Sequence, residues 1–525
     1  MSLRFKESRI TRKLFTNIFA RLSLADAFIA AIVIGSLVSA FNALRTDGVR
    51  ASCSPAILFF RSERFSDQSA MLQVAHANRP YELGLQYPPG ALPVWRLVSV
   101  TPDWMLRWSG MDWIQRHSVL PGLHAMGEQA CRVPQLVSPD VLPLAIAGGL
   151  ELAVIATFLL FSGERLAFRV ATGICVTLGV LGVTSLLDWY ALILAMAATI
   201  SLVAIIVQVT TGCRVPSVVF SPLIACMYPV IFAIDRGNID VYVFLLVAIF
   251  IVFFLQARRP ILAVHVSAII LACAIVIKFF PIFLIGLFFR RRSYRLGLIT
   301  MAVGVIAVYY LSLVGTSESF LDPLIGIRKN LTTSPSNCGV ACDPGWGLIF
   351  GRSLLAFIQY SGVMLGGTNR FSEWYSLLAP HWSRISLIAV FVGAAILSRR
   401  RLPLWVSLGL ATSLVMAFNT GGGVYRLSLV LISAAVMIWQ LQKSSASVVY
   451  LPPDSDIRAA RPAALHYLLV FVMGLSVAPF YVGRIPLSVL GAAPKDTLFG
   501  SGFLIVLVII FGIIVCTPRL WHLRR

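Results

Sequence analysis

Charged residues are scarce in this sequence. Of its 525 residues, 12% are charged and 58% are hydrophobic, and only 22 are acidic. The surface of an ordinary soluble domain needs far more charge, so this composition excludes that class. Apolar stretches of roughly 16 to 22 residues recur along most of the chain, and as helices they are long enough, or nearly so, to cross a membrane. The pattern indicates an all-α polytopic membrane protein, because the strands of a barrel would be shorter and would alternate in polarity.

Three further features are missing. Despite a formal charge of +21, no long basic patch interleaved with aromatic residues exists, which argues against nucleic acid as a partner. The first apolar stretch, Leu24 to Leu44, follows a basic N-terminus but lacks an obvious cleavage site, so we interpret it as an uncleaved first membrane helix. The Cys-x-x-x-Cys pair Cys338 and Cys342 has no nearby histidine, and we expect neither a metal site nor a cofactor.

Arginine-rich turns set the expected topology. Because positive charge concentrates on the cytoplasmic side, we place five basic segments there together with the N-terminus. They are "GERLAFR" (163–169), "ARRP" (257–260), "RRRSYR" (290–295), "RRR" (399–401) and the tail "RLWHLRR". The expected crossings lie near 24–44, 141–162, 170–187, 189–209, 216–234, 241–256, 261–277, 281–289, 296–315, 385–398, 403–418, 426–442, 464–482 and 500–517. This gives a bundle of about 14 (12–14) transmembrane helices with both termini in the cytoplasm.

The segment 281–289 is the weakest of these crossings, because nine residues form an α-helix of only about 14 Å. A single long helix over 261–289 is the alternative. That helix would place one of two arginine-rich turns outside, so the charge rule favours a break at Lys278 to Pro281, where proline lacks the backbone N–H that a helix needs.

Two large external segments follow from this topology, residues 45–140 and 316–384. The first contains short apolar or amphipathic pieces, including "ALPVWRLV", that we interpret as helices at the membrane surface. The expected organisation is a basic N-terminus (1–23), a catalytic membrane module (24–300), a second membrane module (301–442), a cytoplasmic linker (443–463) and a C-terminal hairpin with a basic tail (464–525).

Four cysteines fall in these external segments. In an oxidising compartment they favour disulfides over free thiols. Cys53 with Cys131 and Cys338 with Cys342 is the simplest connectivity, and other pairings remain open.

A polar constellation is expected at the external ends of the helices. "DRGNID" contains Arg236 on the side where positive charge is normally rare, and Lys278 and Arg426 lie at the same level. A cation at the membrane edge needs an anion, and a lipid phosphate or diphosphate would supply one. Alternatively, Arg236 pairs with Asp235 or Asp240 and only fastens a turn, while Lys278 extends to the interface.

The ordered set of Asp67, "YPPG" at 87–90, "DRGNID" and "IKFFP" before a basic turn resembles glycosyltransferase family 87 of the GT-C superfold. The resemblance rests on residues 20–300. It implies an inverting transferase that takes a sugar, often mannose, from a polyprenyl-phosphate donor on the external face. Carried over, it implies that Asp67 is the general base.

We therefore expect an enzyme of a bacterial inner membrane whose active site faces the periplasm and whose acceptor is an envelope glycan or glycolipid. The expected donor-phosphate ligands are Arg236, Lys278 and Arg426, and the expected substrate-binding residues are Tyr87, Asn238 and Asp240. The alternatives are a transporter or flippase for lipid-linked or anionic solutes, and an external-face polysaccharide polymerase or ligase. A transporter would be expected to bind near the membrane midplane within paired repeats, and no convincing repeat is present.

Overall fold

The computed structural model describes part of the chain. The described ranges are 74–99 without 76, 84 and 86, 238–256, 260–327 without 291, 370–418, 424–446, 461–477 and 495–517, with isolated positions near 24–34 and 354–361. All regular elements in these ranges are helices, in agreement with the predicted all-α class. The expected crossings between 141 and 234 lie outside the described residues, as does the basic N-terminus (1–23). Of the expected linker (443–463), residues 447–460 lie outside them, while its two ends belong to helices: 443–446 to the helix that ends at Ala446 and 461–463 to the helix that begins at Arg461.

The helices follow the predicted apolar segments closely. They are α4 (Ala91–Ser99), α14 (Asp240–Gln256), α15 (Pro260–Ile277), η3 (Phe280–Arg290), η4 (Arg292–Arg295), α16 (Leu296–Ser312), α20 (Arg370–Leu378), η6 (Ala379–His381), α21 (Trp382–Ser398), α22 (Leu404–Ala417), η7 (Val424–Leu427), α23 (Ser428–Ala446), α24 (Arg461–Val477) and α26 (Lys495–Cys516).

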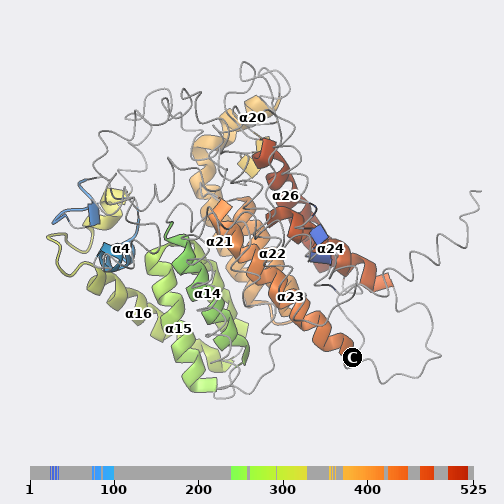
Figure 1. Cartoon of the computed structure of the whole chain (residues 1–525), viewed down its shortest axis with the longest axis horizontal. Coiled ribbons are helices and arrows are strands. Elements are labelled where there is room, and N and C mark those ends of the chain that lie inside the picture. Colours follow the sequence, from blue (N-terminus) through green and yellow to red (C-terminus); the bar gives the residue numbers. More distant parts are fainter. Residues whose placement is uncertain are drawn as a thin grey trace, which may run out of the picture.

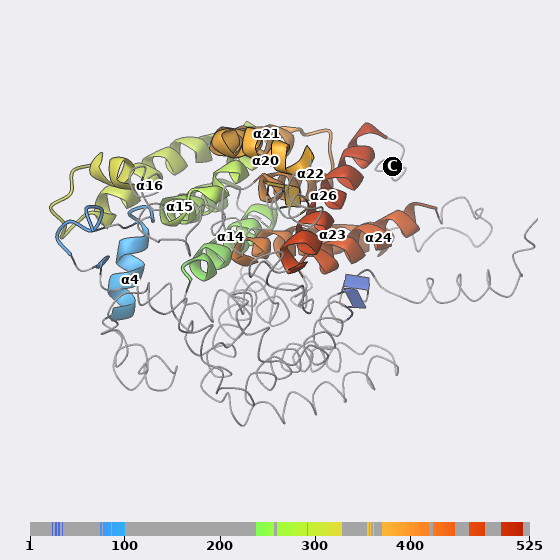
Figure 2. The same cartoon turned by 90° about the horizontal axis from the view of Figure 1, so that it is seen from above.

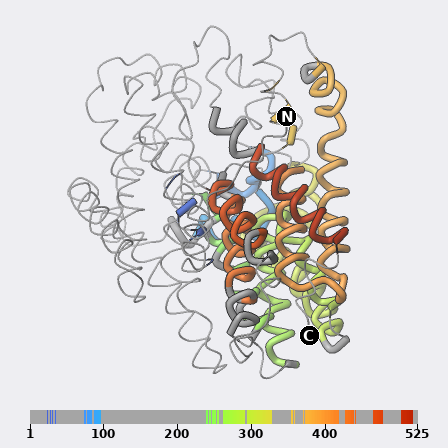
Figure 3. Tube along the Cα trace, turned by 90° about the vertical axis from the view of Figure 1, so that its right-hand side faces the viewer, coloured from blue at the N-terminus to red at the C-terminus, as the bar shows by residue number. Residues whose placement is uncertain are grey.

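The helices pack as a row of neighbours. α14, α15 and α16 lie side by side, and η3 packs between α15 and α21 (Figure 1). Next in the row, α22 contacts α21, α23 and α26. At the end of the row, α24 packs against α23 and α26. The same order is visible from above, where α16 and α21 lie along one edge of the bundle (Figure 2). The tube view shows the long helices running in broadly similar directions (Figure 3).

The predicted break between α15 and η3 is confirmed. α15 ends at Ile277, and the backbone N–H of Lys278 donates to the carbonyl of Ala274 at 3.0 Å as the last helical bond. The following segment is a 3₁₀-helix of 11 residues rather than the α-helix first considered. A 3₁₀-helix rises about 2.0 Å per residue, so η3 reaches roughly 22 Å, appreciably farther than an α-helix of the same length.

Close packing and buried polar bonds hold η3 against α21. A Cβ on Gly286 would lie 2.1 Å from the carbonyl oxygen of Ala394, so only glycine allows this approach. At the end of η3, the Arg290 guanidinium donates to the carbonyls of Leu397 (3.2 Å) and Leu402 and to Ser407 Oγ (2.8 Å). The "RRRSYR" and "RRR" turns therefore meet at one end of the bundle, as two turns on the same side of a membrane must.

One helical stretch in the described residues, Glu373–Ser398, is long and apolar enough to cross a membrane, and shorter apolar helices of 10–17 residues accompany it. Large apolar side chains are exposed on the outer faces of α16 and α21, including Ile299 at 65% and Phe391 at 66%. Exposed apolar area of this kind suits contact with lipid. The number of crossings and the sidedness remain predictions.

Candidate active site

The site begins where the chain enters α14. Asn238 Oδ1 accepts a hydrogen bond from the backbone N–H of Asp240 at 2.9 Å, an Asx turn that leads into the helix. Asp240 is then the first residue of α14, where a carboxylate is favoured by the positive end of the helix dipole. Both side chains are buried, at 4% and 2% exposure. "GNID" thus has a local structural reason, and Asn238, predicted to bind substrate, uses its side-chain oxygen to begin a helix.

Asp240 is paired with Lys278. Lys278 Nζ lies 2.9 Å from Asp240 Oδ2, and the two side chains are 13% and 1% exposed. The other carboxylate oxygen, Oδ1, is buried without a hydrogen-bond partner among the described residues. Asp240 Oδ2 thus pairs with the lysine 38 positions later. The alternative in which Arg236 pairs with Asp235 or Asp240 stays a prediction, because Asp235 and Arg236 lie outside the described residues.

Tyr87 lies under the same lysine. Lys278 Nζ is 5.0 Å from the centroid of the Tyr87 ring, a cation–π distance. The ring edge of Trp95 on α4 contacts Tyr87 with the centroids 6.4 Å apart. The predicted "YPPG" turn is confirmed, and it starts α4 through bonds from Ala91 and Leu92 to the carbonyls of the two prolines.

Gly90 explains why this turn lies so close to α15. Its N–H donates to the carbonyl of Val276 at 3.1 Å. A Cβ at this position would lie 2.7 Å from the Val276 carbonyl and 2.8 Å from the Ile277 nitrogen, both backbone atoms. Glycine therefore permits the approach that brings Tyr87 to Lys278.

Arg426 completes the cluster from the other half of the chain. It lies on η7, half-buried, with its guanidinium carbon 5.2 Å from the centroid of Phe280. It interacts electrostatically with both Asp240 and Tyr87. Two of the three cations predicted to converge are thus found together, and Arg236 lies outside the described residues. Among the described residues, these two cations interact with a single carboxylate, Asp240, and such a cluster favours an anionic ligand.

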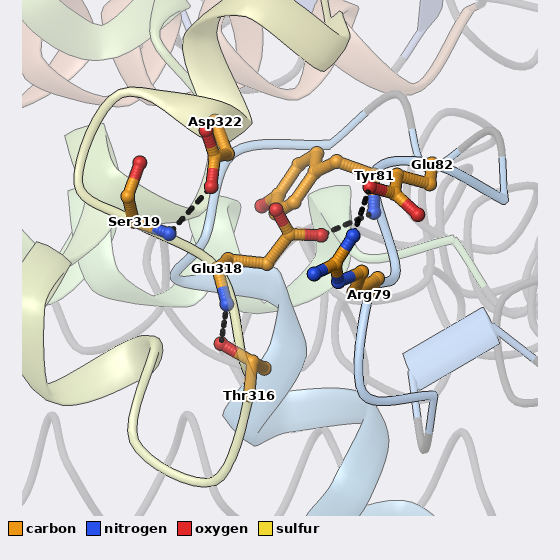
Figure 4. A network of polar contacts seen from close by, with 7 residues as sticks. All are labelled: Arg79, Tyr81, Glu82, Thr316, Glu318, Ser319 and Asp322. Carbon is orange, nitrogen blue, oxygen red and sulfur yellow. Dashed lines mark hydrogen bonds and ion pairs between the residues drawn. The ribbon is translucent and has the colours of Figure 1, made fainter.

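A second polar network connects the two predicted external segments (Figure 4). Glu318 Oε1 accepts the backbone N–H of Tyr81 at 3.2 Å, and the Tyr81 hydroxyl donates to the Tyr87 carbonyl at 3.1 Å. From α4, Arg96 donates to the carbonyls of Ala75 (2.9 Å) and, beyond α16, Val314 (2.8 Å). We call these contacts the loop clasp, because they hold Tyr87 in place from residues far away in the sequence.

Burial affects the clasp electrostatically. It raises the pKa of the Glu318 carboxyl above its ordinary value and also raises the pKa of Tyr81, to which nearby Tyr309 and Glu318 contribute. In contrast, a hydrogen bond from the Ser319 backbone N–H at 2.6 Å lowers the pKa of Asp322. Nothing in the sequence distinguished Glu318, since "GTSESF" contains no motif. Tyr81 lies within residues 20–300, on which the family resemblance rests, but nothing in the sequence identifies Glu318 as its partner.

Several predicted residues fall outside the described part of the chain. They are Asp67, Arg236, Cys53, Cys131, Cys338 and Cys342. Cys273 and Cys516, which are described, are free thiols. The described residues contain no group of His, Cys, Asp and Glu suited to a metal ion.

The comparison with protein families addresses identity. Residues 180–417 match the model of glycosyltransferase family 87. This part of the chain is similar to that family. The family 87 region contains Asp240 and Lys278, but it begins after Asp67 and "YPPG" and ends before Arg426. The match thus extends farther toward the C-terminus than the residues 20–300 on which the resemblance was based, and it starts later.

No curated protein and no solved structure gave a significant match. The match to the family 87 model indicates a glycosyltransferase, an enzyme that binds a sugar donor and an acceptor. The apolar helices of the described residues agree with a membrane location.

Proposed function

We propose that the protein is an inverting glycosyltransferase that moves a sugar from a polyprenyl-phosphate donor to an envelope glycan or glycolipid, on the periplasmic face of a bacterial inner membrane. Mannose is the first sugar to test. The observation that carries this proposal is the cluster of Lys278 and Arg426 around one carboxylate, Asp240, within a glycosyltransferase. Such a cluster suits a phosphate that carries a lipid on one side and a sugar on the other.

The cations act on the leaving group. As the bond between the anomeric carbon and the phosphate oxygen breaks, the electron pair stays with the phosphate, so its negative charge grows. Lys278, Arg426 and Arg236 stabilise that growing charge more than they stabilise the intact donor, and this difference lowers the barrier. A fixed cation of this kind is commonly worth a few kcal/mol.

A base is needed on the opposite side of the sugar. We assign that role to Asp67, which removes the proton of the acceptor hydroxyl as its oxygen attacks the anomeric carbon. One displacement inverts the configuration and releases polyprenyl phosphate, and Asp67 then returns its proton to water. General base catalysis of this type contributes about 10²- to 10⁴-fold.

Tyr87, Asn238 and Asp240 prepare the phosphate site. Asp240 orients Lys278 through the 2.9 Å ion pair, and the Tyr87 ring limits the positions that the ammonium group can take. Asn238 fixes the start of α14 and thereby the place of Asp240. Asp240 Oδ1 retains acceptor capacity that a donor hydroxyl could use.

The test is sugar transfer by purified protein in lipid vesicles with a polyprenyl-phosphate sugar and an acceptor extract. Asp67→Asn should remain folded and lose at least about 100-fold in transfer. Asp322→Asn, which changes an exposed aspartate of the second loop, is the matched control and should retain activity. Wild-type transfer by Asp67→Asn would refute the assignment of the base. Solute uptake by the same vesicles without any use of donor would favour the transporter alternative.

A further inference from the structure

A cleft of about 500 Å³ opens at the end of the bundle where the arginine-rich turns meet. It lies between η3 and α21, at the opposite end of η3 from the Lys278 cluster. Its polar lining consists of Arg295, Arg400 and Ser398, and its apolar lining includes Phe289 and Ala394. Nothing in glycosyl transfer at the other end requires this cleft.

The charge of the lining calls for an anion. Two arginines line the cleft, and its lining among the described residues includes no carboxylate. Arg400 Nε donates to the carbonyl of Phe289 at 3.3 Å, and this hydrogen bond holds the guanidinium against η3. The remaining N–H groups of the guanidinium can donate to an anion in the cleft. Arg295 makes no hydrogen bond or ion pair with the described residues. Guanidinium forks match the geometry of a phosphate, and an anion bound between two such groups would offset their mutual repulsion.

The surroundings of the cleft identify the kind of anion. Arg295 directly precedes α16, and Ala394 belongs to α21; these two helices lie along one edge of the bundle (Figure 2). Both expose large apolar side chains, among them Val303 at 60% on α16 and Leu387 at 57% on α21. A soluble anion would gain nothing from such faces, whereas acyl chains would cover them. A basic cleft bordered by exposed apolar helices is the arrangement expected for a lipid headgroup.

We propose that this cleft binds the headgroup phosphate of an anionic phospholipid, with Arg295 and Arg400 as its ligands and the acyl chains along α16 and α21. The site is separate from the donor site and does not depend on the proposed transfer reaction. The Ser398 hydroxyl donates to the carbonyl of Ala395 at 2.7 Å, so it offers its oxygen as an acceptor for a headgroup hydroxyl. Phe289 packs against the glycerol and first methylene groups.

Native mass spectrometry of the full-length protein in detergent tests this, with phosphatidylglycerol as the probe and phosphatidylcholine for comparison. The wild type should bind phosphatidylglycerol in preference. Arg295→Gln should weaken that binding about fivefold and Arg295→Gln/Arg400→Gln about 30-fold, the effect of losing one or two cations beside a headgroup. The matched control, Arg399→Gln/Arg401→Gln, removes two positive charges next to Arg400 but outside the cleft lining, and it should change binding less than about twofold.

Three results would overturn the proposal. Equal loss in the control and cleft variants would show general attraction to a basic surface. Equal binding of the two lipids would show that the site does not recognise the charge of the headgroup. Displacement of phosphatidylglycerol by millimolar inorganic phosphate would show a site for the free anion. Because Arg295 makes no hydrogen bond among the described residues, its single variant keeps the test valid even if the double variant unfolds.

Discussion

The ion pair between Lys278 and Asp240 supports the sharpest prediction, because it separates a structural role from a catalytic one. With 2.9 Å between Nζ and Oδ2, the attraction is about 6 kcal/mol at an effective dielectric constant of about 20. Most of this attraction offsets the cost of removing both charges from water. Loss of one partner nevertheless leaves the other charge buried without a counterion, which typically lowers the free energy of unfolding by about 3–5 kcal/mol. Arg426 also interacts with Asp240, so we expect Lys278→Met to fall near 3 kcal/mol.

A double variant gives the decisive comparison. In Lys278→Met/Asp240→Leu neither charge remains, and apolar replacements for a buried pair are often neutral in stability. The midpoint of thermal unfolding in detergent should therefore fall in each single variant and return toward the wild-type value in the double variant. Sugar transfer should be lost in Lys278→Met and should stay lost in the double variant, because no ammonium group is left to stabilise the leaving phosphate. Recovery of transfer together with stability would refute the catalytic role and support a pair that only fastens the turn.

Three further predictions follow from the contacts around the site. Gly90→Ala should place a methyl group against rigid backbone atoms, lower the stability by about 1–3 kcal/mol and reduce transfer. Gly512→Ala, whose methyl group would meet no atom within 4 Å, should change neither thermal unfolding nor transfer. Since burial raises the pKa of Glu318, the loop clasp should stabilise the fold more at acidic pH and less as the pH rises through that raised pKa. Glu318→Gln keeps an acceptor for the Tyr81 N–H, and it should remove this dependence of thermal unfolding on pH. Arg290→Gln should cost about 2–3 kcal/mol in stability while transfer per folded molecule stays unchanged.

Each of these has a contrary outcome. Equal effects of the two glycine variants would mean that close approach of the "YPPG" turn is not needed. A pH dependence that survives in Glu318→Gln would assign it to another group. Loss of transfer by folded Arg290→Gln would connect the arginine-rich end of the bundle to the chemistry.

The sequence predicted the helices because their apolar runs are long, and it predicted the break after α15 because Pro281 lacks a backbone N–H. It did not predict the 3₁₀ character of η3, which depends on packing against α21 through Gly286. Charge at the helix ends correctly pointed to Lys278 and Arg426 as neighbours. The choice of Lys278 as the partner of Asp240 could not be predicted, because it depends on how α14 and α15 are rotated about their axes.

The loop clasp shows a limit of a different kind. Glu318 and Tyr81 are 237 positions apart, and neither has a pattern of neighbours that marks the other. Their bond exists because the chain returns from α16 to the level of α4, where Arg96 fixes the carbonyl of Val314. Such pairings follow from tertiary packing, and a single sequence contains no local signal for them.

Photocrosslinking of the donor tests the central claim most directly, since that claim is that the phosphate of a polyprenyl donor lies at Lys278 and Arg426. A polyprenyl phosphate with a photoreactive group next to the phosphate should label the peptides that contain Tyr87, Lys278 and Arg426 in the wild-type protein, and excess unlabelled donor should suppress the labelling. Lys278→Met/Asp240→Leu, which we expect to remain folded, should lose this labelling. Saturable labelling confined to the arginine-rich end, or undiminished labelling in the double variant, would contradict the account.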